Sequence, residues 1–232
     1  MAPKFLLFGD SITQRAFGED GSGDDLAGLG WGGLLAGLYQ RRADIVSRGL
    51  SGYTTAMALE VVDCCKADNV GSNVNLITLW FGANDASLPG LSAQHVPIDD
   101  YKRNTICLIS SLKTLHPRAT IILFTVPPVN ERVWIMDGQV NRTNAAARAY
   151  GDALKEAANE DGVLLYDVWT ALEGDKGADV FGKYLNDGLH LSELGNRRVF
   201  EGLTKLISSD LPELAPTDAK MPYDLPVWRD ML

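Results

Sequence analysis

Five short apolar runs alternate with amphipathic stretches along this chain, and no other feature of the sequence restricts the possible fold as strongly. The clearest run is residues 75–81, which read Asn-Leu-Ile-Thr-Leu-Trp-Phe. The other runs cover residues 5–8, 44–50, 120–126 and 163–168. Apolar runs of this length are typical of strands that are covered on both faces. They predict five buried parallel strands.

The stretches between the runs have the spacing of amphipathic helices. Apolar residues recur three and four positions apart over residues 98–115, and His116-Pro117 ends this helix. Further helices are predicted over residues 31–42, 53–65, 141–159 and about 193–208, the last with Ser192 as its N-cap. Because parallel strands need crossover connections, strands that alternate with helices predict a three-layer α/β/α fold with a five-stranded parallel sheet.

Small or polar residues follow the first three predicted strands. Ser11 follows the first strand, Gly52 the second and Asn84 the third. In an open α/β sheet, ligands bind beyond the carboxyl ends of the strands. We therefore expect these three residues to open into one crevice.

Ser11 on its own has two interpretations. Asp10-Ser11 could simply cap a helix, because both residue types accept hydrogen bonds from the free N–H groups of a first helical turn. Alternatively, Ser11 is a nucleophile, which requires a base within hydrogen-bond reach and a group that orients the base. The choice depends on whether the chain offers such partners.

The stretch Asp-Gly-Leu-His at residues 187–190 offers both partners. It lies between the last predicted strand and the last predicted helix, and one turn can hold both of its polar side chains. We predict that His190 takes the proton from Ser11 and that Asp187 fixes the tautomer of the imidazole. The predicted catalytic set is therefore Ser11, Asp187 and His190.

Acyl transfer also needs donors aimed at the developing oxyanion. The candidates are the backbone N–H groups of Ser11 and Gly52 and the side-chain amide of Asn84. Gly52 suits this role because a residue without a side chain lets a ligand approach the backbone closely. Plainer interpretations stay open, with Gly52 as a turn glycine and Asn84 bonded to its own turn.

Four blocks thus stand in order along the chain: Gly9-Asp10-Ser11, Gly52, Gly82-Ala83-Asn84-Asp85 and Asp187-Gly188-Leu189-His190. Together they resemble the four signature blocks of the SGNH (GDSL-type) hydrolases. The resemblance implies a flavodoxin-like sheet with strand order 2-1-3-4-5 and ester hydrolysis at Ser11. It assigns no proton transfer to Asp85, which we expect to be structural.

Longer stretches resemble the isoamyl acetate-hydrolysing esterases within that family. They are residues 8–14, 48–55 and 82–86, together with Trp228-Arg229-Asp230. The resemblance implies hydrolysis of short-chain acyl esters such as acetates. A thioesterase, a lysophospholipase or a carbohydrate acetylesterase could use the same residues with a different pocket, and a catalytically silent binding protein could keep the scaffold.

The charge balance and the absent motifs restrict the partners. The chain has 30 acidic and 21 basic residues, a formal net charge of −9, and its basic residues do not cluster. This composition argues against nucleic acid as a partner. No His/Cys/carboxylate group has metal-ligand spacing and no Gly-x-Gly-x-x-Gly follows a strand, so we expect neither a metal nor a nucleotide cofactor.

The 232 residues suit one domain with a substantial core. We expect the hydrolase domain over residues 1–210 and a C-terminal arm over residues 211–232. The aromatic residues of this arm, Tyr223 and Trp228, are expected to pack on the domain or on a partner in a homodimer. The glycine-rich stretch at residues 15–30 predicts a flexible loop that borders the crevice.

The remaining reactive side chains are expected to be structural. Cys64, Cys65 and Cys107 make no disulfide framework, and we interpret them as buried or half-buried helix thiols. His95 and His116 are expected to be ordinary surface or turn residues. The sequence lacks a signal-peptide pattern and any apolar stretch of membrane-spanning length, so we expect a cytoplasmic location without membrane insertion.

Overall fold

The computed structural model describes residues 2–18, 29–71, 73–158, 162–226 and 228–231. Most of the predicted glycine-rich loop lies outside these residues.

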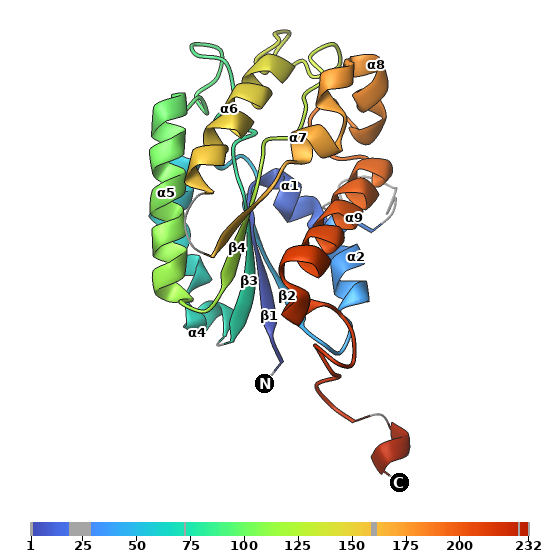
Figure 1. Cartoon of the computed structure of the whole chain (residues 1–232). Coiled ribbons are helices and arrows are strands. Elements are labelled where there is room, and N and C mark those ends of the chain that lie inside the picture. Colours follow the sequence, from blue (N-terminus) through green and yellow to red (C-terminus); the bar gives the residue numbers. More distant parts are fainter. Residues whose placement is uncertain (1, 19–28, 72, 159–161, 227, 232) are drawn as a thin grey trace.

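Five strands form one parallel sheet in the order β2-β1-β3-β4-β5 (Figure 1). They are β1 (Lys4–Gly9), β2 (Asp44–Gly49), β3 (Val74–Trp80), β4 (Thr120–Phe124) and β5 (Val163–Tyr166). Each strand coincides with a predicted run to within one or two residues at either end. The predicted strand order and the three-layer α/β/α fold are confirmed.

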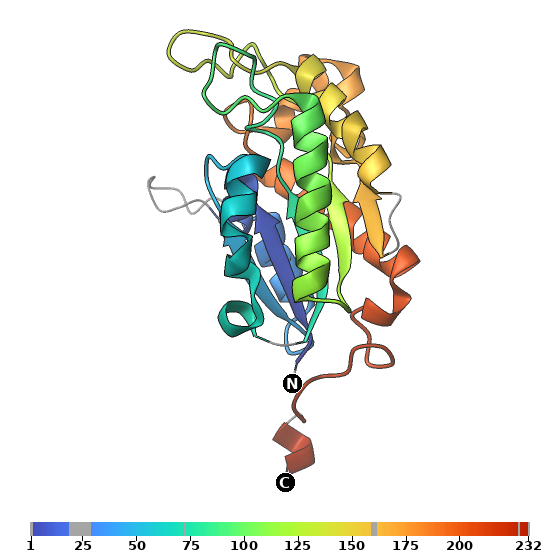
Figure 2. The same cartoon turned by 90° about the vertical axis from the view of Figure 1, so that its left-hand side faces the viewer.

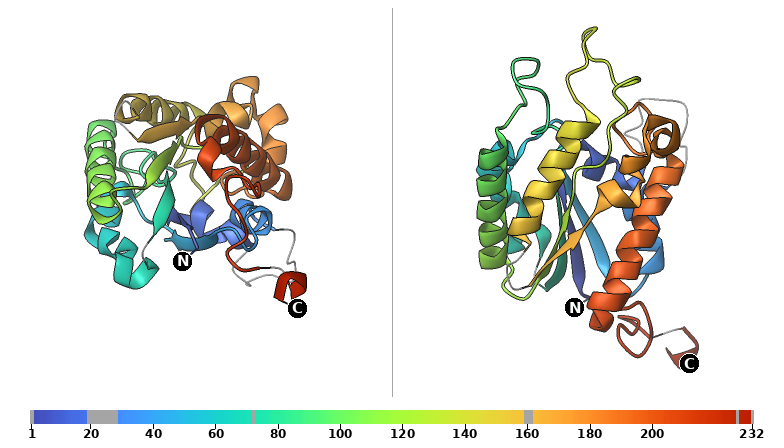
Figure 3. Two further views of the ribbon diagram at one scale, coloured as in Figure 1. Left: turned by 60° about the horizontal axis from the view of Figure 1, so that its bottom comes forward. Right: turned by 45° about the horizontal axis from the view of Figure 1, so that its top comes forward.

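Helices cover both faces of the sheet. One face carries α3 (Thr55–Val61), α5 (Ile98–Leu115) and α6 (Asn144–Ala157), and the other carries α2 (Trp31–Leu38) and α9 (Glu193–Asp210). In the left view of Figure 3 the sheet separates α5 from α2 and α9. The predicted cap of α9 is present, because the Ser192 hydroxyl accepts a hydrogen bond from the Gly195 N–H at 3.2 Å.

Short helices were not predicted, and one predicted helix is interrupted. The four-residue helices are α1 (Ser11–Gln14), α4 (Ala67–Val70), α7 (Val168–Ala171) and α8 (Ala178–Phe181). The 3-10 turns are η1 (Arg15–Phe17), η2 (Val62–Cys65), η3 (Gly174–Lys176), η4 (Gly182–Tyr184), η5 (Pro212–Leu214) and η6 (Trp228–Met231). The helix predicted over residues 53–65 ends as α3 at Val61 and continues as η2. Stretches of about four residues are too short for the helical period to show in a sequence.

The side chains of β1 alternate between two cores. Phe5 and Leu7 belong to the cluster that includes residues of α2 and α9, whereas Leu6 and Phe8 belong to the cluster that includes residues of α5. All four side chains are fully buried. A strand covered on both faces needs apolar residues at every position, which is why the first run is continuous.

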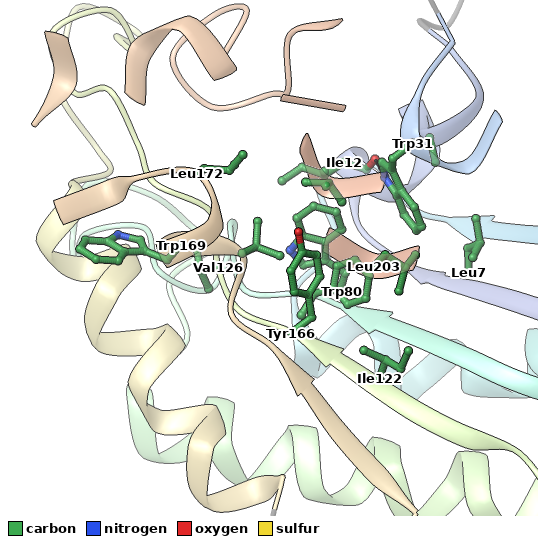
Figure 4. Close-up of a cluster of buried hydrophobic side chains, with 14 of the residues drawn as sticks. Leu7, Ile12, Trp31, Trp80, Ile122, Val126, Tyr166, Trp169, Leu172 and Leu203 are labelled. Atoms are coloured by element: carbon green, nitrogen blue, oxygen red, sulfur yellow. Dashed lines mark hydrogen bonds between the residues drawn. The ribbon is translucent and has the colours of Figure 1, made fainter. Parts of the chain in front are cut away.

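Aromatic rings join the sheet to α2 at the carboxyl ends of the strands (Figure 4). The Trp80 ring centroid lies 5.7 Å from that of Trp31 and 4.8 Å from that of Phe124, which in turn lies 5.2 Å from the Tyr166 ring. The Trp80 indole N–H also donates to the Thr125 carbonyl oxygen at 3.1 Å. These contacts give a rigid base to the loops that follow the strands.

The C-terminal arm leaves α9 toward the end of the molecule where the N-terminus lies (Figure 2). Part of it contacts the domain: Met221 is buried, and the Tyr223 ring centroid lies 4.5 Å from the Arg41 guanidinium carbon and 4.3 Å from that of Arg42. Farther along, Leu225 and Trp228 are each 67% exposed.

Cys107 corrects one expectation. It lies on the exposed side of α5, out of phase with the buried Leu108 and Leu112, whereas Cys64 is half-buried and Cys65 is buried as expected. All three are free thiols.

Within the described ranges, no helix combines the length and the hydropathy needed to cross a membrane.

Replacing Phe124 with Ala should lower the free energy of unfolding by about 3–5 kcal/mol, because it leaves a cavity between the rings of Trp80 and Tyr166. Urea unfolding followed by circular dichroism measures this change. Phe17→Ala is the control, since Phe17 is 42% exposed, and should change the free energy by only about 0.5 kcal/mol. Equal effects of the two substitutions would contradict the role of the aromatic cluster.

Candidate active site

The first strand leads directly into the site. A Cβ atom on residue 9 would collide with the Trp80 carbonyl oxygen, so only glycine fits where β1 turns into α1. Asp10 is the N-cap of α1, and its Oδ1 accepts a hydrogen bond from the Ile12 N–H at 3.0 Å. The helix-cap interpretation therefore applies to Asp10, while Ser11 is the first residue of α1 and is 6% exposed.

The turn between η4 and α9 carries His190 and Asp187. The His190 Nε2 atom lies 2.9 Å from the Ser11 Oγ, and its Nδ1 lies 2.6 Å from the Asp187 Oδ2. Asp187 Oδ1 accepts the N–H groups of Leu189 at 3.0 Å and His190 at 2.8 Å. Gly188 has φ +93°, a conformation that favours glycine. The structure thus brings together the three side chains named as the predicted catalytic set.

Asp187 is held in its charged form. Burial alone would raise the pKa of Asp187, but the hydrogen bonds from the His190 ring and from the N–H groups of His190 and Leu189 outweigh it and lower this pKa to about 2. An ionised carboxylate at Nδ1 places the ring proton on that nitrogen. Nε2 is then left to accept a proton from Ser11.

Backbone hydrogen bonds join the loop after β1 to the loops after its two neighbouring strands. The Leu50 N–H donates to the Gly9 carbonyl oxygen at 2.8 Å, and the Asp10 N–H donates to the Trp80 carbonyl oxygen at 3.1 Å. The loops that carry Gly52 and Asn84 are thereby attached to either side of the segment that carries Ser11. All three lie at the carboxyl ends of the strands, as expected for an open α/β sheet.

Gly52 and Asn84 differ in how they are held. Gly52 has φ +80°, so it is a turn glycine as well as a candidate donor. Asn84 is 4% exposed, and its side chain does not bond to its own turn. Its Nδ2 donates to the Tyr53 carbonyl oxygen at 2.9 Å, and its Oδ1 accepts from the Arg142 Nη2 at 3.0 Å.

Two residues near the site were missed by sequence reasoning. Arg142 is 2% exposed and bonds to Asn84, and the Trp134 ring centroid lies 5.9 Å from that of His190, edge to face. Both belong to the irregular segment between β4 and α6. A single Arg or Trp in a loop has no periodic pattern around it, so the sequence offered no sign that either is directed inward.

Two further carboxyl groups lie buried beside the site. Burial, together with repulsion from the Asp85 carboxylate, raises the pKa of Asp10 to about 7, and burial raises the pKa of Asp85 to about 6. Asp85 Oδ1 accepts the Thr55 N–H at 2.9 Å and the Thr55 hydroxyl at 2.5 Å. Asp85 therefore connects the loop after β3 to the first residue of α3.

The other two histidines lie elsewhere, and one corrects the sequence-based expectation. His95 is half-buried in a turn, with its Nδ1 2.6 Å from the Ser87 carbonyl oxygen. His116 is only 6% exposed, because it ends α5 facing η2 and its Nε2 lies 2.5 Å from the Cys65 carbonyl oxygen. In the described part of the chain, no three His, Cys, Asp or Glu side chains are grouped so that they could hold a metal ion.

Most of this chain matches one protein family. The profile of the GDSL-like Lipase/Acylhydrolase family matches residues 7–198, a span that contains every residue of the candidate site. The chain belongs to the GDSL-like lipase/acylhydrolase family. The family resemblance predicted from the four sequence blocks is thereby confirmed, and the protein is a carboxylic ester hydrolase.

Curated relatives within this family are similar along almost the whole chain. The isoamyl acetate-hydrolyzing esterase 1 homolog of Mus musculus is 36% identical, with 99% of this chain and 88% of the relative covered. The isoamyl acetate-hydrolyzing esterase of Saccharomyces cerevisiae is 34% identical, with 99% and 95% covered. A GDSL esterase/lipase of Arabidopsis thaliana is 36% identical, with 96% and 97% covered.

Solved structures show the same fold at lower identity. The lipase/acylhydrolase from Enterococcus faecalis is 21% identical, with a TM-score of 0.65 over 90% of this chain and 96% of that chain. An acetylxylan esterase from Geobacillus stearothermophilus is 23% identical, with a TM-score of 0.66 over 88% and 94%. At these identities the likeness concerns the fold alone.

The buried Asp85 should make stability depend on pH. Because its folded-state pKa is raised above the unfolded value, the folded protein binds the proton more tightly, and the free energy of unfolding falls as the pH rises from about 4 to about 6. Asp85→Asn removes this term while keeping an acceptor for Thr55. From pH 4.5 to pH 7, urea unfolding should show the variant gaining on the order of 1–2 kcal/mol relative to the wild type.

The exposed Asp179 provides the matched control for this measurement. Asp179→Asn removes one carboxylate from the surface and should follow the wild-type pH dependence closely. If Asp85→Asn also runs parallel to the wild type between pH 4.5 and pH 7, the buried carboxylate does not carry the assigned electrostatic cost.

Proposed function

We propose that this protein is a serine esterase that hydrolyses short-chain acyl esters, acetates foremost, through a Ser11-His190-Asp187 triad and an acyl-enzyme intermediate. The observation that carries the proposal is the continuous hydrogen-bonded series from Ser11 Oγ to His190 at 2.9 Å and from His190 to Asp187 at 2.6 Å. This is the arrangement that acyl transfer at a serine requires.

In the first half of the reaction, Ser11 Oγ attacks the ester carbonyl carbon while His190 Nε2 takes the hydroxyl proton. The carbonyl oxygen becomes an oxyanion, which the N–H groups of Ser11 and Gly52 and the side-chain amide of Asn84 stabilise. The C–O bond to the alcohol then breaks. The leaving alcohol carries away the proton that His190 held, and the acyl group stays on Ser11.

In the second half, His190 takes a proton from water, and the hydroxide attacks the acyl carbon. The acid is released when the proton on His190 returns to Ser11 Oγ. Asp187 stays ionised throughout, because its lowered pKa opposes protonation, and it stabilises the imidazolium that forms in each half. These steps use only side chains and backbone groups of the chain, so we propose that the reaction needs no cofactor.

The relatives support the proposed acetate preference. The mouse and yeast proteins named isoamyl acetate-hydrolyzing esterases are similar over 99% of this chain, so the segments around the site have counterparts in them. A panel of an acetate ester, an octanoate ester, an acyl thioester and an acetylated sugar separates this assignment from the thioesterase, lysophospholipase and carbohydrate acetylesterase alternatives. The acetate ester of a simple alcohol should give the highest kcat/KM.

One further proposal concerns the assembly of the molecule. The exposed end of the C-terminal arm, with Leu225 and Trp228, offers an apolar surface for a second copy in a homodimer. Deleting residues 217–232 should then reduce the sedimentation coefficient. A cytoplasmic location and the absence of nucleic-acid binding stay predictions from the sequence.

Replacing Ser11 or His190 with Ala should lower kcat for the acetate ester by several orders of magnitude, because the first change removes the nucleophile that forms the acyl-enzyme and the second removes the base of both halves. Asn84→Ala should lower kcat by about 10²–10³-fold through loss of one oxyanion donor.

A fluorophosphonate probe should label the folded wild type but not Ser11→Ala. The exposed Ser110, replaced with Ala, is the control and should keep full activity. Rapid hydrolysis by Ser11→Ala would overturn the proposal.

A further inference from the structure

Arg142 is a buried cation whose hydrogen bonds go to neutral oxygens. It donates to the Ala83 carbonyl oxygen at 2.8 Å and to three side-chain amide oxygens: Asn141 at 3.1 Å, Asn84 at 3.0 Å and Gln94 at 2.7 Å. Its exposed fraction is 2%. Burial without a directly bonded carboxylate is unfavourable for a guanidinium and lowers the pKa of Arg142. The arrangement therefore needs an explanation other than stability.

The guanidinium decides which way the Asn84 amide faces. Arginine can only donate hydrogen bonds, so the Asn84 atom that faces Arg142 must be the oxygen. The amide nitrogen then lies on the opposite side, where it donates one hydrogen to the Tyr53 carbonyl oxygen. An amide NH₂ group carries two hydrogens, so a second donor is left for a ligand.

Gln94 extends the same network to the other candidate donor. Its Oε1 accepts from the Arg142 Nη2, and its Nε2 donates to the Gly52 carbonyl oxygen at 2.8 Å. This bond fixes the peptide that follows Gly52. It thereby restrains the backbone of Gly52, which has φ +80° and, as a glycine, would otherwise be conformationally free. One side chain, Arg142, is thus connected to the groups around both Asn84 and Gly52.

We propose that Arg142 is a positioning residue for the oxyanion hole: it fixes the Asn84 amide with its nitrogen toward the substrate and polarises that amide through the bond to Oδ1. A positive charge on the amide oxygen side draws electron density from the nitrogen, which makes the remaining N–H a stronger donor. The proposal rests on the proposed function, in which Asn84 binds the oxyanion.

The effect should appear in kcat rather than in KM. The oxyanion carries full charge only in the transition state and the tetrahedral intermediate, so a better donor stabilises these species more than the bound ester. A residue that only supported the fold would instead lower the amount of active protein without a selective change in kcat per active site.

A double-mutant cycle with Arg142→Met and Asn84→Ala tests the proposal, using kcat and KM for p-nitrophenyl acetate per fluorophosphonate-titrated site. Arg142→Met alone should lower kcat about 10- to 100-fold and change KM less than about 3-fold. In the Asn84→Ala background the same substitution should change kcat less than about 3-fold, because Arg142 acts through the missing amide.

Arg148→Met is the matched control, since Arg148 lies on α6 with its guanidinium carbon 4.5 Å from the Trp169 ring centroid and is not part of this network. It should keep wild-type kcat. Arg142→Lys keeps the charge with fewer donors and should retain more kcat than Arg142→Met. If Arg142→Met does not fold, as judged by circular dichroism, the cycle is run with Arg142→Lys and the same loss of effect in the Asn84→Ala background is expected.

The outcomes separate this inference from the proposed function. Additive losses in the cycle, or wild-type kcat for the Arg142 variants, would overturn the positioning role while Ser11→Ala and Asn84→Ala remain impaired. Near-wild-type kcat for Ser11→Ala or Asn84→Ala would instead overturn the proposed function, and the inference about Arg142 would fall with it.

Discussion

The hydrogen bond between Ser11 Oγ and His190 Nε2 joins residues 179 positions apart, and the geometry of the site depends on it. One partner begins α1 at the end of β1, and the other lies in the turn before α9. Nothing in the local sequence of either segment places it near the other. Only the sheet, with β1 between β2 and β3 and with α9 packed on one face, brings them to 2.9 Å. The fold therefore brings side chains from two separate turns within hydrogen-bond distance of each other.

The carboxyl groups around the site show how environment sets charge. Asp187 receives donors on both oxygens, which outweigh burial and lower its pKa to about 2. Asp10 and Asp85 are buried more deeply, and burial raises their pKa values to about 7 and about 6. The same chemical group is thus ionised in Asp187, where hydrogen bonds stabilise its charge, and ionises less readily in Asp10 and Asp85, where burial disfavours the charge. The buried Arg142 lies within the same polar region, and its charge opposes the repulsion that Asp10 experiences.

The large elements could be read from the sequence because each carries its own pattern. A strand covered on both faces, such as β1, is apolar at every position, and α5 repeats its apolar residues over 18 positions. The four-residue helices and 3-10 turns repeat nothing, so they appeared only in the structure. His116 and Cys107 were misjudged for a related reason: their burial depends on which side of α5, or which end of it, a neighbouring element covers.

The sequence by itself determined the strand-helix alternation, the three strand-end residues Ser11, Gly52 and Asn84, and the Asp187-His190 turn, because local composition and spacing are enough to define each of them. Tertiary structure alone decided that Arg142 is buried against Asn84 and that Gln94 links it to Gly52. The physical reason is that a loop arginine is solvated by default. Only the oxygens that several distant loops present to it can replace water, and no local pattern in the chain records where those loops meet.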